Sequence, residues 1–169
     1  MSMTSSATTK VTLPSDTEIL ITREFDAPRA LVFKAMTDPD LIPRWWGPRK
    51  YQTTVDKMDV RPGGAWRFIV REPDGRETGF RGEYREIVAP ERIVQTFEWE
   101  PMAGHISIET ATFTEHNGRT LLTNRTQFSS KEDRDGMIQS GMEGGLRETH
   151  DRFAELLVEL RAADRSSHR

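Results

Sequence analysis

The sequence of 169 residues contains no cysteine, and no apolar run approaches the roughly 18 residues that a transmembrane helix needs. The missing cysteines exclude disulfide bonds, thiolate metal sites and a cysteine nucleophile. Nine of the first seventeen residues are Ser or Thr, without the apolar centre of a signal peptide. We therefore expect a disordered tail over residues 1–17, no membrane partner and a cytoplasmic location.

Clustered charge and common catalytic motifs are missing as well. There are 24 Lys and Arg against 27 Asp and Glu, and the basic residues form no face that would attract nucleic acid. No P-loop, G-x-G-x-x-G, G-x-S-x-G or H-E-x-x-H occurs. His105 and His116 bracket one predicted strand, so they lie roughly 36 Å apart. We therefore expect no metal site, no cofactor and no nucleic-acid partner.

A regular alternation of apolar and polar residues follows the tail. The stretch "EILITREF" at 18–25 has the period of a half-buried strand, and the "DAP" after it favours a short helix over 28–37. Asp38 and Pro39 favour a second short helix over about 39–45. Two short helices are therefore expected between the first and second strands.

Six further strand-like runs come next. Asp74-Gly75 and Asn117-Gly118 are strong hairpin signals, and the other connections are also short. Such connections force antiparallel neighbours, because a parallel crossover needs about a dozen residues or more. The sequence therefore predicts an antiparallel meander whose strands cover about 51–59, 64–71, 77–88, 92–99, 106–116 and 119–128.

A long amphipathic helix is predicted over about 134–161, and Ser129 with Glu132 has the spacing of a capping box before it. One stripe of this helix is apolar and consists of Met142, Leu146, Thr149, Phe153, Leu156, Leu157 and Leu160. We expect an α+β fold in which a seven-stranded curved antiparallel sheet wraps around this helix. The single domain would cover 18–161, with a C-terminal tail over 162–169.

Four segments carry a family resemblance: "REFDAPRALVFKAMTDPDLIPRWWGP", "DVRPGGAWRF", "GEYREIVAPERIVQTFEWE" and "GMEGGLRETHDRFAELL". They resemble the activator of heat-shock protein 90 ATPase homologue 1-like family, within the START/SRPBCC (helix-grip, birch-pollen-allergen-like) superfamily. The resemblance covers about residues 18–160. It implies a helix-grip fold with a cavity between sheet and helix that usually holds a hydrophobic ligand. The superfamily includes lipid carriers, polyketide cyclases and aromatases, so the fold does not specify the function.

Three positions depart from the family's pattern in the last helix. Gly144 replaces an acidic residue, Leu146 a large aromatic residue and His150 a leucine. A smaller side chain beneath a sheet frees space unless its neighbours fill it. We therefore expect a cavity of roughly 300–1,000 Å³, the usual range for small-ligand sites.

Adjacent tryptophans occur in "PRWWGPRK" at 43–50, where the resemblance places the closed end of the cavity. One interpretation is that one or both tryptophans plug the core, and the other is that Trp46 forms cavity wall or entrance, with its indole N–H free for a ligand. We expect both to hold, with Trp45 as the plug, although the two roles could be exchanged. Gln95, Asn124 and Thr126 lie in apolar series, where an unpaired polar group would cost about 1–3 kcal/mol. They bond to one another, to water or to a ligand, unless the faces are shifted by one residue.

The predicted ligand-binding residues share the inner faces of the strands and the last helix. They are Trp46, Trp66, Phe68, Gln95, Phe97, Trp99, Asn124, Thr126, Leu146, His150 and Phe153. Glu83, Glu86, Glu109 and Glu115 are interpreted as solvated. An alternative for His150 is an edge histidine that bonds a backbone carbonyl.

We expect the cavity to bind a small apolar or aromatic molecule, without covalent catalysis. One alternative is an enzyme of the polyketide cyclase/aromatase kind in which His150, with an ordinary pKa near 6.5, transfers a proton. The other is a stress-response module whose partner is a chaperone, as the family's name suggests.

Overall fold

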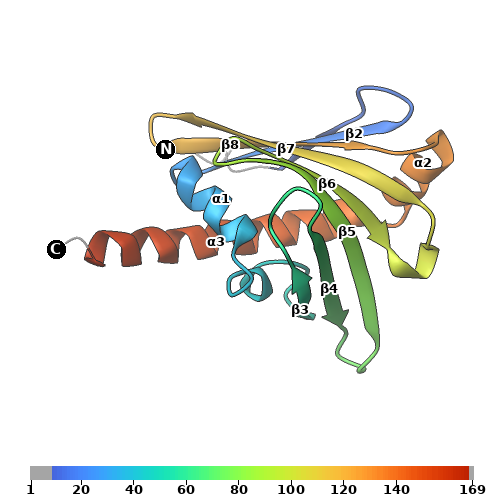
Figure 1. Cartoon of the computed structure of the whole chain (residues 1–169), viewed down its shortest axis with the longest axis horizontal. Coiled ribbons are helices and arrows are strands. Elements are labelled where there is room, and N and C mark those ends of the chain that lie inside the picture. Colours follow the sequence, from blue (N-terminus) through green and yellow to red (C-terminus); the bar gives the residue numbers. More distant parts are fainter. Residues whose placement is uncertain (1–8, 168–169) are drawn as a thin grey trace.

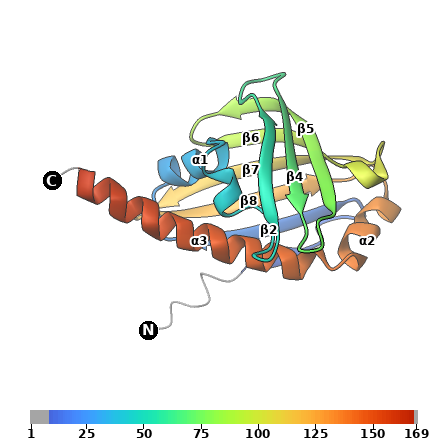
Figure 2. The ribbon, with the colours of Figure 1, turned by 90° about the horizontal axis from the view of Figure 1, so that it is seen from below.

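The computed structural model describes residues 9–167, which form an eight-stranded antiparallel sheet curved around a long C-terminal helix (Figures 1 and 2). Seen from below, the helix crosses the concave face of the sheet, with α1 beside it (Figure 2). The elements are β1 Lys10–Thr12, β2 Glu18–Phe25, α1 Arg29–Thr37, the 3-10 turn η2 Ile42–Arg44, β3 Gln52–Met58, β4 Ala65–Arg71, β5 Glu77–Val88, β6 Arg92–Trp99, the 3-10 turn η3 Glu100–Met102, β7 Ile106–His116, β8 Arg119–Gln127, α2 Lys131–Gln139 and α3 Met142–Ser167.

The strands lie in the order β1-β2-β8-β7-β6-β5-β4-β3, and every neighbouring pair is antiparallel. The segment from β3 to β8 is the expected meander. β2 joins its far edge by pairing with β8, from Glu18 opposite Gln127 to Phe25 opposite Thr120. The antiparallel sheet and the long helix expected from the sequence are therefore confirmed.

The sheet has eight strands and not the expected seven, because residues 10–12 pair with β2. Val11 packs with the cluster of Ile19, Ile21 and Phe128, which gives this short edge strand an apolar anchor. Part of the segment interpreted as a disordered tail over 1–17 is thus ordered, while residues 1–8 lie outside the described residues. The sequence did not predict this strand, because its three residues contain a single apolar residue and are too few to show an alternation.

The predicted helix over 134–161 is in fact two helices, α2 and α3, separated at Ser140 and Gly141. Gly141 has a φ of 82°, a conformation that glycine adopts at little cost and that ends α2. The N-cap is Ser130, whose hydroxyl accepts from the backbone N–H of Asp133, and not Ser129 as predicted. α3 continues to Ser167, through most of the expected tail, and residues 168–169 lie outside the described residues.

The second short helix, expected over about 39–45, is reduced to the single 3-10 turn η2. The Asp38 side chain accepts from the backbone N–H of Asp40, so it forms a local turn and not the cap of a longer helix. This turn still delivers the two tryptophans to one end of the sheet.

Two irregularities in strand pairing allow the sheet to curve, and one glycine makes room on its inner face. The pairing of β3 with β4 shifts between Val55 and Lys57, and that of β5 with β6 shifts between Tyr84 and Glu86. Such bulges bend a strand and increase its twist. A Cβ at Gly82 would lie 2.5 Å from Nε1 of Trp66. Only glycine therefore allows the Trp66 indole to pack this closely against β5.

Candidate functional site

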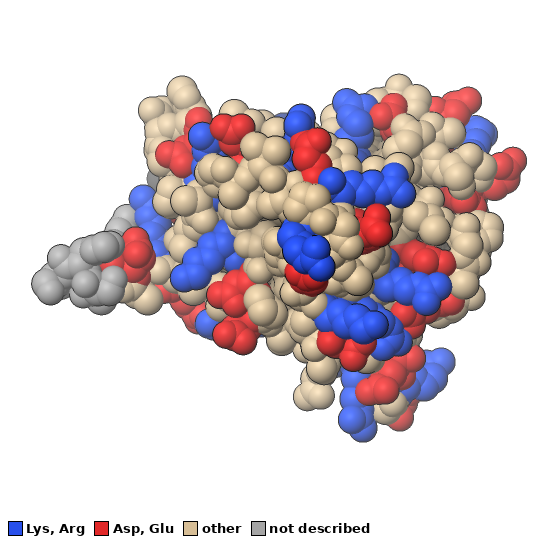
Figure 3. Space-filling model, in the orientation of Figure 1, with Lys and Arg blue, Asp and Glu red and all other residues tan. Residues whose placement is uncertain are grey.

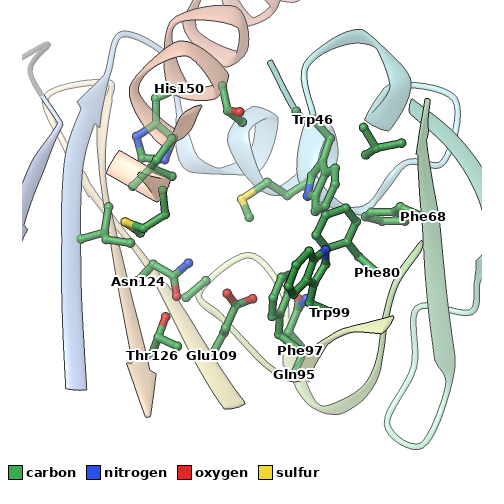
Figure 4. A pocket seen from close by; sticks show the side chains of 18 of the residues that line it. Trp46, Phe68, Phe80, Gln95, Phe97, Trp99, Glu109, Asn124, Thr126 and His150 are labelled. Carbon is green, nitrogen blue, oxygen red and sulfur yellow. The ribbon is translucent and has the colours of Figure 1, made fainter. Parts of the chain in front are cut away.

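A cavity of about 500 Å³ lies between the concave face of the sheet and α3 (Figure 4). β2 and β4 to β8 form its floor, α3 lies opposite, and residues of α1, α2 and the Trp45–Pro48 segment close its ends. The volume falls within the predicted range, which is typical of sites for small organic ligands.

The eleven residues predicted from sequence all line this cavity. The inner-face assignment of the strands therefore has the correct register, although lining a cavity does not by itself demonstrate ligand binding. They are Trp46, Trp66, Phe68, Gln95, Phe97, Trp99, Asn124, Thr126, Leu146, His150 and Phe153.

The two adjacent tryptophans have different surroundings, as expected. Trp45 is 6% exposed, its indole N–H donates to the carbonyl of Ala35 at 3.0 Å, and its ring lies 4.4 Å from that of Phe153. Trp46 is only partly buried, and no hydrogen bond of its indole N–H to a described residue is found. Both tryptophans therefore border the cavity, Trp45 from within the core and Trp46 as a less deeply buried part of the wall.

One side of the cavity is a continuous aromatic wall (Figure 4). The Trp46 ring stands edge-on to Phe68 and Phe80, with centroids 5.2 and 5.0 Å apart. Phe97 continues the wall at 5.8 Å from Phe80, and Trp99, which is 39% exposed, stands at its outer end. Edge-to-face packing of this kind keeps the rings in fixed orientations.

A row of polar side chains begins beside this wall and continues across the cavity floor (Figure 4). Gln95 on β6 lies opposite Glu109 on β7, and Glu109 lies opposite Thr126 on β8. Asn124 lies two residues before Thr126 on β8 and therefore on the same face of the sheet. Its Oδ1 is buried and has no hydrogen-bond partner, because its cross-strand neighbours are the apolar Ile21 and Ala111.

Glu109 was interpreted as solvated, and that interpretation is wrong. Its side chain lines the cavity and points into it (Figure 4), in series with Ser107, Ala111 and Phe113 on the inner face of β7. Burial alone raises the pKa of this carboxyl from 4.5 to about 7. The alternation of Ala111 and Phe113 carried the signal, since period two places Glu109 on their face.

His150 lies on α3 at the opposite side of the cavity and is 7% exposed. Its Nδ1 is 2.9 Å from the hydroxyl of Thr9, so its partner is a side chain of the N-terminal segment and not a backbone carbonyl. Burial, and then the charge of Arg23, lowers the pKa of the imidazole from 6.5 to about 4. The imidazole is therefore neutral at physiological pH and a weak base.

The cavity has an unusual charge balance. Two glutamates, Glu72 and Glu109, line it, whereas none of its described lining residues is Lys or Arg. Glu72 pairs with Arg76 at 3.6 Å, but the Glu109 carboxyl has no hydrogen bond or ion pair to any described residue. Neutral and cationic groups can approach Glu109 without an electrostatic penalty, whereas an anion cannot.

The outer surface differs from the cavity, since positive and negative side chains are interspersed on the face shown in Figure 3. None of the described helices is both long enough and apolar enough to cross a membrane. Within residues 9–167, no three His, Asp or Glu side chains gather closely enough to hold a metal ion.

Comparisons with solved structures support the fold. A protein from Rhodobacter sphaeroides has a TM-score of 0.84 and 23% identity, with 90% of this chain and 99% of that chain covered. Ms6760 from Mycobacterium smegmatis has a TM-score of 0.79 and 27% sequence identity, and the match covers 88% of this chain and 95% of that chain. A protein from Arthrobacter aurescens has a TM-score of 0.81 and 26% sequence identity, and the match covers 89% of this chain and 91% of that chain.

A comparison with curated proteins finds no match. The family model described as Activator of Hsp90 ATPase homolog 1-like protein matches residues 26–158, which include both short helical segments, β3 to β8 and most of α3. By this match and by its helix-grip architecture, the chain belongs to the activator of Hsp90 ATPase homolog 1-like family.

Proposed function

We propose that this protein binds a small, largely apolar molecule in the cavity between the sheet and α3. The observation that carries the proposal is the cavity itself: about 500 Å³, with an aromatic wall and a row of polar side chains in which the buried amide oxygen of Asn124 lacks a hydrogen-bond partner. A purely structural core would be filled, because an empty apolar space costs stability. An unpaired buried amide oxygen at Asn124 adds a further cost that a ligand donor would offset.

Burial of apolar surface supplies the affinity. A ligand that buries roughly 200 Å² of apolar surface gains about 5 kcal/mol, before the costs of association are subtracted. A gain of about 5 kcal/mol corresponds to a dissociation constant of about 0.2 mM, so any tighter binding depends on how well the polar end of the ligand is satisfied. The polar row of Gln95, Glu109 and Thr126 then determines the orientation of the ligand.

Native mass spectrometry of the protein purified from its source tests this proposal. We expect a bound small molecule that is released on denaturation, and the variant Leu146→Trp should lose it because the new ring occupies the cavity beside α3. A protein that carries no ligand and binds no apolar probe in either form would refute the proposal.

A proton-transfer reaction is the second candidate, and Glu109 is the observation that favours it. A general acid or base works best when its pKa lies near the working pH, and burial raises the pKa of Glu109 to about 7. His150, the candidate from sequence, fits less well because its pKa is lowered to about 4. Conversion of a bound ligand that Glu109→Gln abolishes while binding persists would identify an enzyme. The chaperone partner remains a prediction from the family's name.

A further inference from the structure

The chemistry of the polar row narrows the class of ligand. Within the cavity, Glu109 is an acidic group without a cation, and none of the described lining residues can supply one. Arg23 is buried beneath α3 near His150, but it pairs with Asp151 at 2.8 Å and does not line the cavity. A carboxylate or phosphate ligand would therefore meet no compensating positive charge.

The groups around Glu109 can all accept a hydrogen bond, and Gln95, Asn124 and Thr126 can also donate one. The strand register places Gln95 and Thr126 directly beside it, about 5 Å away between Cβ atoms, and Asn124 on the diagonal. The buried amide oxygen of Asn124 has no donor. A ligand ammonium group offers three N–H donors, so it can donate to this oxygen and to the Glu109 carboxylate at the same time.

The aromatic wall favours the same charge. The rings of Trp46, Phe80, Phe97 and Trp99 face the space into which Glu109 points (Figure 4). The negative face of an aromatic ring attracts a cation, and this attraction is stronger in a site from which water is excluded. The wall and the carboxyl thus reinforce each other.

We infer that the cavity takes a small, largely apolar molecule with a basic nitrogen, which pairs with the Glu109 carboxylate between Gln95 and Asn124. This inference rests on the proposed binding function and specifies its ligand class. The apolar body of the molecule lies against the aromatic wall, and its ammonium group points to the floor of the sheet.

Proton linkage follows from the same geometry. The other titratable groups that line the cavity are Tyr51, Glu72, Tyr84 and His150. Burial lowers the pKa of His150 to about 4 and raises that of Tyr84, so both are uncharged from pH 6 to pH 8. Burial raises the pKa of Glu109 to about 7, so an ammonium ligand must displace its proton at lower pH. Affinity for an amine therefore rises about tenfold between pH 6 and pH 8.

Three probes of one shape test the inference: 1-adamantylamine, 1-adamantanol and 1-adamantanecarboxylic acid, which are cationic, neutral and anionic. Calorimetric titration of the full chain is performed at pH 6, 7 and 8. We expect the amine to bind at least about tenfold more tightly than the alcohol at pH 8. The affinity for the amine should also rise between pH 6 and pH 8, as predicted above. Proton release, measured in buffers of different ionisation enthalpy, should accompany amine binding at pH 6.

Glu109→Gln separates charge from shape, because it keeps the size of the side chain. We expect this variant to lose both the preference for the amine and the pH dependence, while it still binds the alcohol. Glu83→Gln is the matched control: Glu83 is exposed on β5 and does not line the cavity, so its removal changes the net charge alone.

The outcomes distinguish the inference from the function on which it rests. If the alcohol or the acid binds as tightly as the amine at pH 8, the ligand class is wrong and the binding function stands. An amine preference that Glu109→Gln leaves intact would also overturn the inference. If none of the probes binds at about 1 mM, the proposed function fails and the inference fails with it.

Discussion

Glu109 on β7 and His150 on α3 line the same cavity from opposite sides, and burial shifts their pKa values in opposite directions (Figure 4). The carboxyl titrates near 7 and the imidazole near 4. Between these values both groups are uncharged, so the empty cavity avoids the cost of an isolated buried charge over a broad range of pH.

These two groups should therefore contribute with opposite sign to the pH dependence of stability. From pH 4.5 to 7 the folded protein keeps the Glu109 proton that the unfolded chain releases, so stability falls with rising pH by up to about 3 kcal/mol. From pH 6.5 down to 4 the unfolded chain protonates His150 and the folded protein does not, so stability falls with falling pH by a similar amount. As the pH rises from 4.5 to 6.5, the free energy of unfolding of Glu109→Gln should therefore increase, because only the His150 contribution remains. That of His150→Gln should decrease over the same range, because only the Glu109 contribution remains. Urea unfolding across this range checks both slopes, and two variants with profiles parallel to that of the natural protein would contradict them.

Trp46 should report ligand binding through its fluorescence more strongly than Trp45, because Trp46 is only partly buried in the cavity wall, whereas Trp45 also borders the cavity but is 6% exposed and packed into the core. Titration with the non-fluorescent 1-adamantylamine should change the tryptophan emission, and Trp46→Phe should remove most of that change. Trp45→Phe is the control and should retain it. A change that survives in both single variants would mean that neither indole touches the ligand.

Replacement of each tryptophan by alanine should separate their roles in stability. Trp45→Ala removes a buried ring together with its hydrogen bond to Ala35, and should lower the free energy of unfolding by about 3–5 kcal/mol. Trp46→Ala should cost less, since this ring is only partly buried, but should weaken ligand binding more. Chemical denaturation and ligand titration on the same variants measure both effects, and equal stability losses would contradict the division.

Leu146→Trp should fill space beside the cluster of Ile19, Ile21 and Phe128. We expect a stability change within about 1.5 kcal/mol, because the new ring can enter the cavity, and a loss of affinity for apolar probes of at least about tenfold. Val158→Trp, at a position that is 64% exposed on α3, is the control and should leave affinity unchanged. Undiminished binding by Leu146→Trp would place the ligand elsewhere.

The N-terminal segment should contribute to stability although β1 has only three residues. The Thr9 hydroxyl lies 2.9 Å from His150, and its carbonyl accepts from Arg147 at 2.7 Å. Thr9→Val removes the first bond and leaves the imidazole without this partner, at a cost of about 1 kcal/mol. Thr12→Val, at an exposed position of β1, should change the midpoint of thermal unfolding less. Equal midpoints for the two variants would show that the contact contributes nothing.

The sequence predicted most of the sheet because alternation and hairpin turns are local signals. The bounds of β2, β5, β6 and β7 match the predicted 18–25, 77–88, 92–99 and 106–116. β1 was missed because three residues show no period, and the break at Gly141 was missed because glycine also occurs within helices. These errors lie where tertiary pairing decides the structure.

The cavity residues were predictable for the same reason, since a correct register determines the inner face of every strand. Glu109 was the exception, because a carboxyl among Ser, Thr and Ala looks solvated when hydrophobicity alone is considered. Only the strand register shows that it lies between Gln95 and Thr126. Its elevated pKa depends on burial by distant elements, which no local pattern encodes.

The difference in burial between Trp45 and Trp46 has a consequence for substitutions at the two positions. The two residues are neighbours in sequence and both border the cavity, but Trp45 is the more deeply buried of the two. Under the proposed binding function, substitutions at position 46 alter the cavity wall at a smaller cost in stability than substitutions at position 45.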